Sequence, residues 1–256
     1  MNASMKFDSS KLLPLVGPLV LFLLWFWVVW AKLVSPVLLP DPVVTLEHLF
    51  VSVIQGTLMD DFWSTVGRTM KAFLIAAGIG VPLGVILGSS ERLYRSVEFL
   101  IDFFRSTPSS ALIPLFLTIF GITDVNKIAI AAFAAVLVIL FNSAYGVMNA
   151  RKMRIMAAKV MGASRLQIFR DVLFWESLSQ TFVGLRSGIS MALVIVVVAE
   201  MFIGSEQGLG HRIIDAQQVL NVKEMYASIL AAGILGYAMN VFFLVCEKKV
   251  VHWAGK

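Results

Sequence analysis

The stretch Ala150–Trp175, which reads ARKMRIMAAKVMGASRLQIFRDVLFW, is the longest polar interruption in an otherwise apolar chain. It predicts two short helices joined by a bend. The apolar side chains of the first helix recur at helical spacing, at Met153, Met156, Ala157, Val160 and Met161. Gly162 is expected to end this helix in a left-handed conformation, and Ser164 with Gln167 predicts a capping box for the second helix. A basic amphipathic hairpin of this kind either lies on lipid headgroups or docks into a partner.

Composition places this hairpin in a membrane protein. Of the 256 residues, 59% are hydrophobic and the mean hydropathy is +0.86, which is more apolar surface than a soluble core could absorb. The single cysteine, Cys246, leaves no intrachain disulfide framework and no Cys-rich metal site. We therefore expect residues 1–256 to form one all-α transmembrane domain that contacts membrane lipid and binds no metal.

Six apolar stretches are long enough to cross a hydrocarbon core of about 30 Å at about 1.5 Å per residue. The expected spans are about 12–31, 65–88, 97–120, 128–147, 179–203 and 227–245, with the hairpin 150–175 between the fourth and the fifth. Small residues recur every four positions in two of them, at Gly80, Gly84 and Gly88 and again at Gly184 and Gly188. Neighbouring helices are expected to approach closely at these glycines.

The distribution of positive charge predicts the orientation. Thirteen of the 21 Lys and Arg residues lie in the terminal segments, in the loop 89–96 and in the hairpin. Because positive residues are retained on the cytoplasmic side, the hairpin and both termini are expected in the cytoplasm. Positive residues that cluster at the ends of spans indicate how the chain is oriented in the membrane. They give no reason to expect nucleic acid as a partner.

Polar residues within the spans are the candidates for a translocation pathway: Asp102, Arg105, Asn142, Arg186 and Glu200. Arg105 and Arg186 are expected at similar depth, about 10–12 Å from the cytoplasmic ends of their spans. An arginine inside a membrane needs a charged partner or water. Two interpretations stay open. Either Arg105 pairs with Asp102 and Arg186 with Glu98 or Glu176, or the two cations face a pathway and favour an anion.

Three stretches carry a resemblance to a known family. AAKVMGASRLQIFRDVL, residues 157–173, resembles the cytoplasmic "EAA" loop of bacterial ABC-transporter permeases, especially the nitrate, sulfonate, taurine and bicarbonate branch. FFRSTPSSALIPLFLTIFG, residues 103–121, resembles the third span of that branch, and GLRSGISMALVIVVVAEMF, residues 184–202, followed by GLG resembles its fifth span and outer loop. This chain has Met156 where the family usually has Glu, and Trp175 where it usually has Pro.

The resemblance implies a six-helix type I ABC importer permease of a bacterial inner membrane. Its partners would be a second permease copy in a homodimer, two cytoplasmic ATPase subunits and an external substrate-binding protein. The hairpin residues implied at the ATPase contact are Met156, Ala157, Ala158, Gly162, Ala163, Ser164 and Phe169. The implied cargo is a small anion such as nitrate, bicarbonate or a sulfonate, and a thiamin-pyrimidine-like vitamin precursor is the alternative.

Catalysis is not expected of this chain. It contains no G-x-x-x-x-G-K-[ST] phosphate loop, so ATP and Mg are expected in the partner ATPase subunits, and this chain is expected to bind no cofactor. Two other classes remain as alternatives. A membrane-embedded enzyme would depend on His211 and Asp215, which are four residues apart on an expected helix. A scaffold protein would explain the packing glycines and leave the polar third span and the hairpin unexplained.

Overall fold

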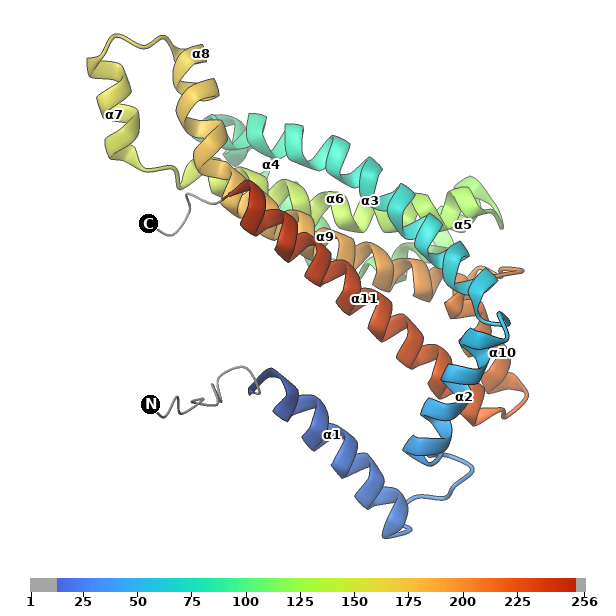
Figure 1. Cartoon of the computed structure of the whole chain (residues 1–256). Helices are drawn as coiled ribbons and strands as arrows, with labels where there is room; N and C mark the ends of the chain where they lie inside the picture. Colours follow the sequence, from blue (N-terminus) through green and yellow to red (C-terminus); the bar gives the residue numbers. More distant parts are fainter. Residues whose placement is uncertain (1–12, 252–256) are drawn as a thin grey trace, which may run out of the picture.

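The computed structural model describes residues 13–251, and within that range all of the regular secondary structure is helical. Its elements are α1 (Leu13–Trp30), α2 (Pro42–Ile54), α3 (Met59–Gly88), α4 (Glu91–Ser106), η2 (Ser109–Leu112), α5 (Ile113–Phe120), α6 (Asp124–Met148), α7 (Lys152–Val160), α8 (Arg165–Ile168), η3 (Phe169–Leu173), α9 (Phe174–Phe202), α10 (Leu209–Gln218) and α11 (Val222–Val250). Figure 1 shows them as a tilted bundle from which α7 and α8 project at one end. The predicted fold class, an all-α membrane protein, is confirmed.

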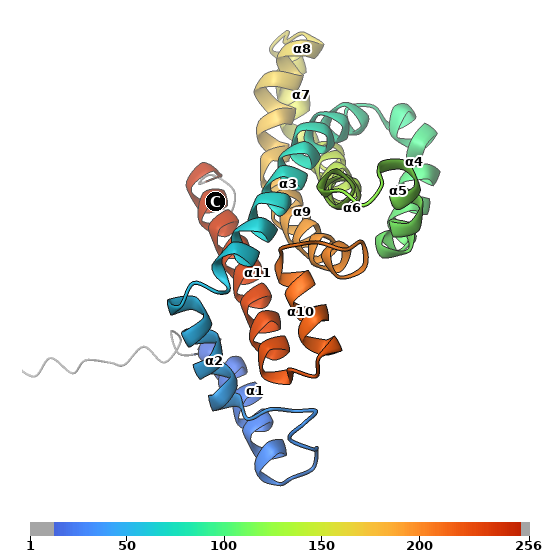
Figure 2. The same cartoon turned by 90° about the vertical axis from the view of Figure 1, so that its right-hand side faces the viewer.

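Helices α3, α6 and α9 form the centre of the bundle, and their glycines allow them to lie close together. A Cβ atom at Gly84 would lie 2.7 Å from the Cβ of Ser143 on α6, and one at Gly188 would lie 2.6 Å from Cγ1 of Ile139. Neither distance is tolerable, so only glycine fits. The close approach predicted at these glycines is confirmed. Figure 2 shows α4 and α5 on one side of this core and α1 and α2 on the other.

Four helical runs are long and apolar enough to cross a membrane: 59–88, 124–148, 165–202 and 222–250. The second, fourth, fifth and sixth predicted spans lie mostly within these runs. The helices extend beyond the apolar stretches because their polar ends continue the backbone hydrogen bonding past the hydrocarbon region. The bent pair of 91–106 with 109–120 would be a fifth span if counted as one.

The predicted third span, 97–120, is not one straight helix. Its two parts, α4 and the run from η2 through α5, meet at an angle of 89°. Thr107 leaves the helix with φ −78° and ψ 125°, the extended conformation that the following Pro108 imposes. The hydroxyl of Thr107 donates to the carbonyl of Phe103 over 2.9 Å. The residues of the third predicted span therefore form a right-angled turn.

Helix α1 stands apart from the bundle in Figure 1 and corresponds to the first predicted span. The indole nitrogen of Trp25 donates to the carbonyl of Pro40 over 3.0 Å, and the Trp25 ring lies 5.8 Å from that of Tyr226 on α11. Helix α2 lies in the connection between α1 and α3 and begins after the N-cap residue Asp41. Most of the surface of α1 is therefore left for lipid or for another chain.

The bundle has two distinct ends. We call the end with α7 and α8 the hairpin end, and the end with α10 and the segment 203–208 the loop end. Figure 1 shows that α1 begins and α11 finishes toward the hairpin end. Lys248 and Lys249 lie in the last turn of α11, near that end.

Changing Gly84 to Ala should lower the stability of the purified protein by roughly 1–3 kcal/mol, because the added methyl overlaps Ser143 and the backbone of α6. Gly78 lies on the same helix, and a Cβ added there would meet nothing within 4 Å, so Gly78→Ala is the matched control. The control should be neutral or stabilising by up to about 1 kcal/mol. Thermal unfolding in one detergent compares the two variants, and equal stabilities would contradict the close-packing account.

Candidate functional site

The turn of the hairpin has the geometry that the sequence predicted. Gly162 follows α7 with φ +80°, in the left-handed region. The hydroxyl of Ser164 accepts the backbone N–H of Gln167 over 3.3 Å, and the Gln167 side-chain oxygen accepts the N–H of Ser164 over 2.8 Å. This reciprocal pair is the capping box, so the predicted box and the left-handed glycine are both confirmed.

Large apolar side chains cover the outside of this hairpin. We call them the hairpin apolar face: Met153, Met156, Ala157, Val160, Met161 and Leu166, all exposed. Val160 is 89% exposed and Met153 is 77% exposed. A contiguous exposed apolar patch marks a contact with another protein or with a membrane.

The other residues implied at the ATPase contact take different positions. Gly162 and Ser164 are exposed at the turn, and Ala163 and Phe169 are half-buried. Ala158 is buried, on the side of α7 that faces the rest of the subunit. Ala158 therefore supports the hairpin from inside and does not contribute to its exposed face.

The second helix of the hairpin continues directly into the fifth predicted span. α8, the π-helical segment η3 and α9 make one helical run over residues 165–202. The sequence placed a break between the hairpin and a span starting at 179, and the structure shows none. Arg154 of α7 forms an ion pair with Glu176 at the base of α9, and this pair holds α7 against the run.

The two intramembrane arginines each have a carboxylate nearby. Arg105 lies 3.4 Å from Asp102, as one interpretation predicted, and its guanidinium lies 3.7 Å from the centroid of the Phe141 ring. Arg186 lies 3.8 Å from Glu247 of α11. The partners predicted for Arg186 were wrong, since Glu176 is paired with Arg154. Sequence spacing could not bring α11 beside α9.

Arg186 also lines a hollow between α9 and α11. The hollow has a volume of about 440 Å³ and is lined by Arg186, Ser187, Ser190, Met191, Val194 and Asn240. The Arg186 side chain is one-third exposed and its carboxylate contact is long. An arginine in this position can exchange its contact with Glu247 for a contact with a small anion.

Asn142 and Glu200, the other intramembrane candidates, lie inside the subunit. The Asn142 side chain donates to the carbonyl of Val138 over 2.8 Å and accepts from Gln180 over 3.0 Å, so it joins α6 to α9. Glu200 is 0% exposed. Both side chains form hydrogen bonds within the subunit; Glu200 is fully buried and Asn142 is half-buried.

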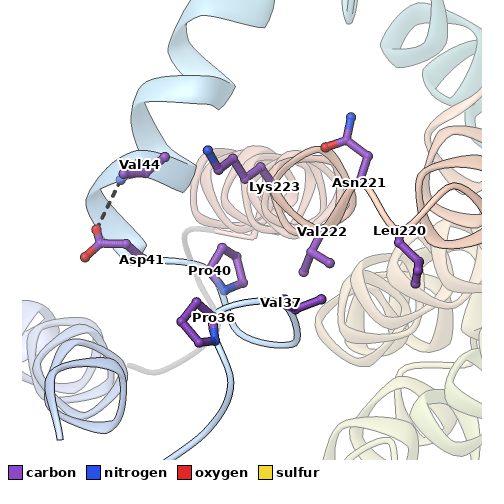
Figure 3. A pocket seen from close by; sticks show the side chains of 9 residues that line it. All are labelled: Pro36, Val37, Pro40, Asp41, Val44, Leu220, Asn221, Val222 and Lys223. Atoms are coloured by element: carbon purple, nitrogen blue, oxygen red, sulfur yellow. Dashed lines mark hydrogen bonds between the residues drawn. The ribbon is translucent and has the colours of Figure 1, made fainter. Parts of the chain in front are cut away.

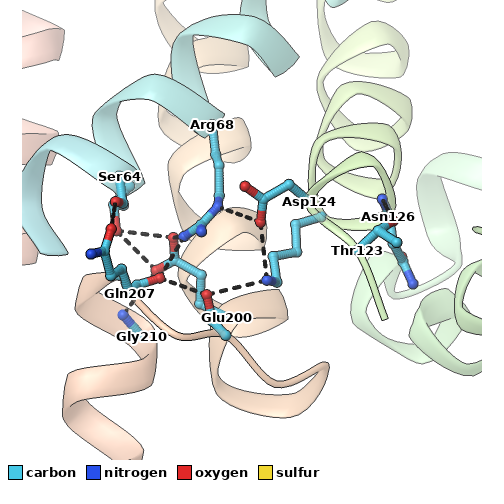
Figure 4. Close-up of polar contacts among 12 residues, drawn as sticks. Ser64, Arg68, Thr123, Asp124, Asn126, Glu200, Gln207 and Gly210 are labelled. Atoms are coloured by element: carbon cyan, nitrogen blue, oxygen red, sulfur yellow. Dashed lines mark hydrogen bonds and ion pairs between the residues drawn. The ribbon is translucent and has the colours of Figure 1, made fainter. Parts of the chain in front are cut away.

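Glu200 belongs to a group of polar residues that we call the loop-end cluster: Asp61, Thr65, Arg68, Asp124, Lys127 and Glu200. Figure 4 shows Arg68, Asp124 and Glu200 converging from α3, α6 and α9. Arg68 donates to Glu200 over 2.7 Å and to Asp124 over 3.0 Å. Lys127 lies 3.2 Å from Asp124. The buried charges are therefore paired, as burial requires.

Sequence reasoning did not single out this cluster apart from Glu200, although a signal was present. Asp61, Thr65 and Arg68 recur at i, i+4 and i+7, so they share one face of α3. The second span was expected to begin at 65, which placed Asp61 in a loop and hid the pattern.

Further pockets open at the loop end. One, of about 620 Å³, lies over the cluster and is lined by Arg68, Ile122, Thr123, Asp124, Lys127, Gly204, Ser205, Glu206 and Gln207. Another, of about 540 Å³, lies between the connection from α1 to α2 and the start of α11. Figure 3 shows Pro36, Pro40 and Val37 facing Val222 across it.

The residues of the enzyme alternative, His211 and Asp215, line an open pocket of about 440 Å³ beside the ion-paired Arg212. His211 lies 3.0 Å from Asp215 one turn along α10, and the Asp215 side chain is 55% exposed. Among the described residues, no three His, Cys, Asp or Glu side chains gather as a possible metal site. The pair matches a solvated helix face.

Residues 80–251 match the family described as "Binding-protein-dependent transport system inner membrane component", and the chain belongs to that family. Together with this match, the all-helical bundle and the projecting amphipathic hairpin identify the membrane permease subunit of a type I ABC importer. The enzyme and scaffold alternatives are not favoured.

Curated relatives cover nearly the whole chain. The taurine transport system permease protein TauC of Escherichia coli is 28% identical over 93% of this chain and 88% of its own length. The putative aliphatic sulfonates transport permease protein SsuC of Bacillus subtilis is 27% identical over 93% and 86%. The nitrate import permease protein NrtB of Synechocystis is 28% identical over 83% and 80%.

A solved structure supports the fold. The MetNI methionine ABC transporter in an inward-facing conformation contains a chain that superposes with a TM-score of 0.64 at 23% identity, covering 75% of this chain and 95% of that one.

Replacing Ser164 by Ala should loosen the start of α8 by about 1 kcal/mol, because the N–H of Gln167 loses its acceptor. Ser164→Asp keeps an acceptor at the same position and is the control. Hydrogen exchange of the peptide covering 164–170 should speed up in the alanine variant alone. Equal exchange in both variants would mean that the capping box does not stabilise this turn.

Proposed function

We propose that the hairpin docks into a separate cytoplasmic ATPase subunit and that this permease passes a small anion across a bacterial inner membrane. The observation that carries the proposal is the hairpin apolar face, which the described part of the subunit leaves uncovered. Apolar side chains on a short helix pair fit a groove in another protein. The run 165–202 then leads from this contact through the bundle.

The orientation follows from charge. The hairpin end carries Arg151, Arg154, Arg165 and Arg170, and the last turn of α11 carries two lysines near the same end. Positive residues stay on the cytoplasmic side, so the hairpin end and both termini are cytoplasmic and the loop end faces outward. ATP and Mg would be held by the ATPase subunits, and this chain would bind no cofactor itself.

The assembly has two copies of the permease, two ATPase subunits and an external binding protein that delivers the cargo at the loop end. The hollow beside Arg186 fits a homodimer, because it lies open on the surface of one subunit, where a second copy would enclose it. Residues 1–256 would form a single transmembrane domain in each copy.

A small anion is the proposed cargo, in line with the taurine, sulfonate and nitrate named for three relatives. Within this chain the proposal rests on Arg186, which lines the hollow, and on Arg105, which is only partly covered by Phe141. A cation one-third exposed within a membrane segment attracts an anion that has shed part of its water. A thiamin-pyrimidine-like precursor carries no negative charge and would gain nothing from these arginines.

Replacing Arg186 by Gln should lower uptake of an anionic cargo about tenfold while basal ATP hydrolysis stays unchanged, because only the charge in the hollow is lost. Arg186→Lys keeps the charge and is the matched control. Uptake of nitrate, taurine and methanesulfonate into proteoliposomes containing the complete transporter measures the effect. Arg105→Gln is tested in parallel. Normal uptake of all three anions by both glutamine variants would contradict an arginine-lined pathway.

The docking proposal is tested at the turn of the hairpin. Gly162→Val should cost roughly 1–2 kcal/mol of local strain, since a β-branched residue does not adopt φ near +80°. A Cβ added at Gly162 would meet nothing within 4 Å, so the strain is in the backbone and not a clash. The bend should shift, and ATPase binding or its coupling to uptake should weaken while the permease remains inserted.

Gly162→Asn is the matched control for that variant, because Asn accepts the left-handed conformation far better than Val does. Co-purification of the ATPase subunit and the ratio of uptake to ATP hydrolysed are measured for both. A second variant, Met156→Glu, places the family's usual residue in the hairpin apolar face and should weaken binding if the groove is apolar. Wild-type binding and uptake by Gly162→Val would overturn the docking proposal.

A further inference from the structure

The start of α10 is capped by side chains from other helices. Three successive backbone N–H groups at its N-terminus donate to three different acceptors. Gly208 donates to Asp61 over 2.8 Å, Leu209 donates to Thr65 over 2.8 Å, and Gly210 donates to Glu200 over 3.0 Å. The N-cap residue itself, Gly208, has no side chain to offer. The orphan donors of a helix start are thus satisfied by α3 and α9.

Thr65 connects these contacts. Its hydroxyl accepts from the N–H of Leu209 and donates to the two oxygens of Glu200, over 3.0 and 2.9 Å. Thr65 and Glu200 are both 0% exposed. The hydroxyl of Thr65 thus holds the N–H of Leu209 and the carboxylate of Glu200 in a fixed relative position. Removing this hydroxyl would leave both buried groups without that hydrogen-bond partner, which is costly.

Two glycines allow the helix to come this close. A Cβ at Gly208 would lie 2.6 Å from both carboxylate oxygens of Glu200, and one at Gly210 would lie 2.8 Å from the Cβ of Glu200. Gly208 also has φ +136°, where other residues are strained. The backbone of the loop therefore rests directly on the carboxylate.

Arg68 extends the contacts to α6. It donates to Glu200 and to Asp124, and it also donates to the carbonyl of Gln207 over 2.7 Å. The start of α10 is consequently bonded to α3 and α9 directly, and to α6 through Arg68. These three helices are the ones that glycine packing holds together.

We propose that Glu200 and Thr65 are positioning residues that lock α10 onto the α3, α6 and α9 core. As a result, the hairpin and α10 move as one body. The locked α10 offers a fixed surface to the external binding protein. The helical run 165–202 begins at the hairpin and carries Glu200 at its other end. The run between the hairpin and Glu200 is helical throughout, with the π-helical segment η3 near its start and no loop within it, so a displacement of the hairpin has a continuous helical route to α10. The joint motion of the hairpin and α10 and the contact with the binding protein rest on the proposed function, since they need the ATPase contact and the external partner.

Thr69 provides a matched control. It lies one turn further along α3, is also 0% exposed, and its hydroxyl has no hydrogen-bond partner within the described residues. Thr65→Val and Thr69→Val make the same change of shape on the same helix. Only Thr65→Val removes hydrogen bonds to the start of α10. Thr65→Ser keeps the hydroxyl and should behave like the wild type.

Hydrogen exchange of the full chain in nanodiscs tests the lock itself. Thr65→Val should speed exchange in peptides covering 208–213 about tenfold, because the lost bonds stabilise those amides. Thr65→Ser and Thr69→Val should stay within about twofold of wild type. Should Thr65→Val not insert, Gly210→Ala replaces it, since its Cβ meets Glu200 and the carbonyl of Val197. Unchanged exchange in the Thr65→Val or the replacing variant overturns the lock.

ATP hydrolysis by the complete transporter tests the consequence. The concentration of taurine-loaded or nitrate-loaded binding protein that gives half-maximal stimulation should rise about tenfold in Thr65→Val, with the basal rate unchanged. Faster exchange with unchanged stimulation would overturn the link between α10 and the external partner. A wild-type complex that no loaded binding protein stimulates would instead sink the proposed function, and the exchange experiment would still decide the lock.

Discussion

The close approach of three helix backbones is the constraint on which this protein depends. In a membrane, lipid tails are as apolar as leucine, so helices associate through packing and not through exclusion of water. Ile139 of α6 illustrates the consequence, because its side chain fits between Gly80 of α3 and Gly188 of α9. Each glycine removes the side chain that would separate two helices. The core is held by this contact along most of its length, and the other elements attach to it.

Most charged residues of that core lie toward its two ends. At the loop end Arg68, Lys127 and Glu200 are buried, and their contacts with one another and with the partly exposed Asp124 join three helices in one arrangement. At the hairpin end the basic residues remain exposed beside an apolar face, where they are available to a partner or to lipid headgroups. Between them, Arg186 keeps a long contact with Glu247 and remains partly open.

Local patterns in the sequence predicted much of this arrangement. Glycines at intervals of four, the capping box at Ser164 and the left-handed Gly162 each depend on a few neighbouring residues, so spacing alone identifies them. The angle after Pro108, the continuity of α8 with α9 and the contact of Arg186 with Glu247 depend on how distant segments pack. Predicting the loop-end cluster would have required both the local spacing of residues and the packing of distant segments. Its face on α3 is periodic, but Asp124 and Glu200 come from helices whose neighbourhood the sequence does not specify.

The π-helical segment η3 has a consequence for the angular position of the hairpin. A π turn holds more residues than an α turn, and each residue of an α-helix advances the chain by about 100° around the axis. The five residues Phe169–Leu173 therefore determine the direction in which everything before them faces relative to α9. A chain shorter by one residue there could form a regular α-helix, yet Met156 and Val160 would then point to another side of the molecule. The segment η3 thus sets the rotation of the hairpin about the axis of α9, and any partner that binds the hairpin apolar face would have to match that rotation.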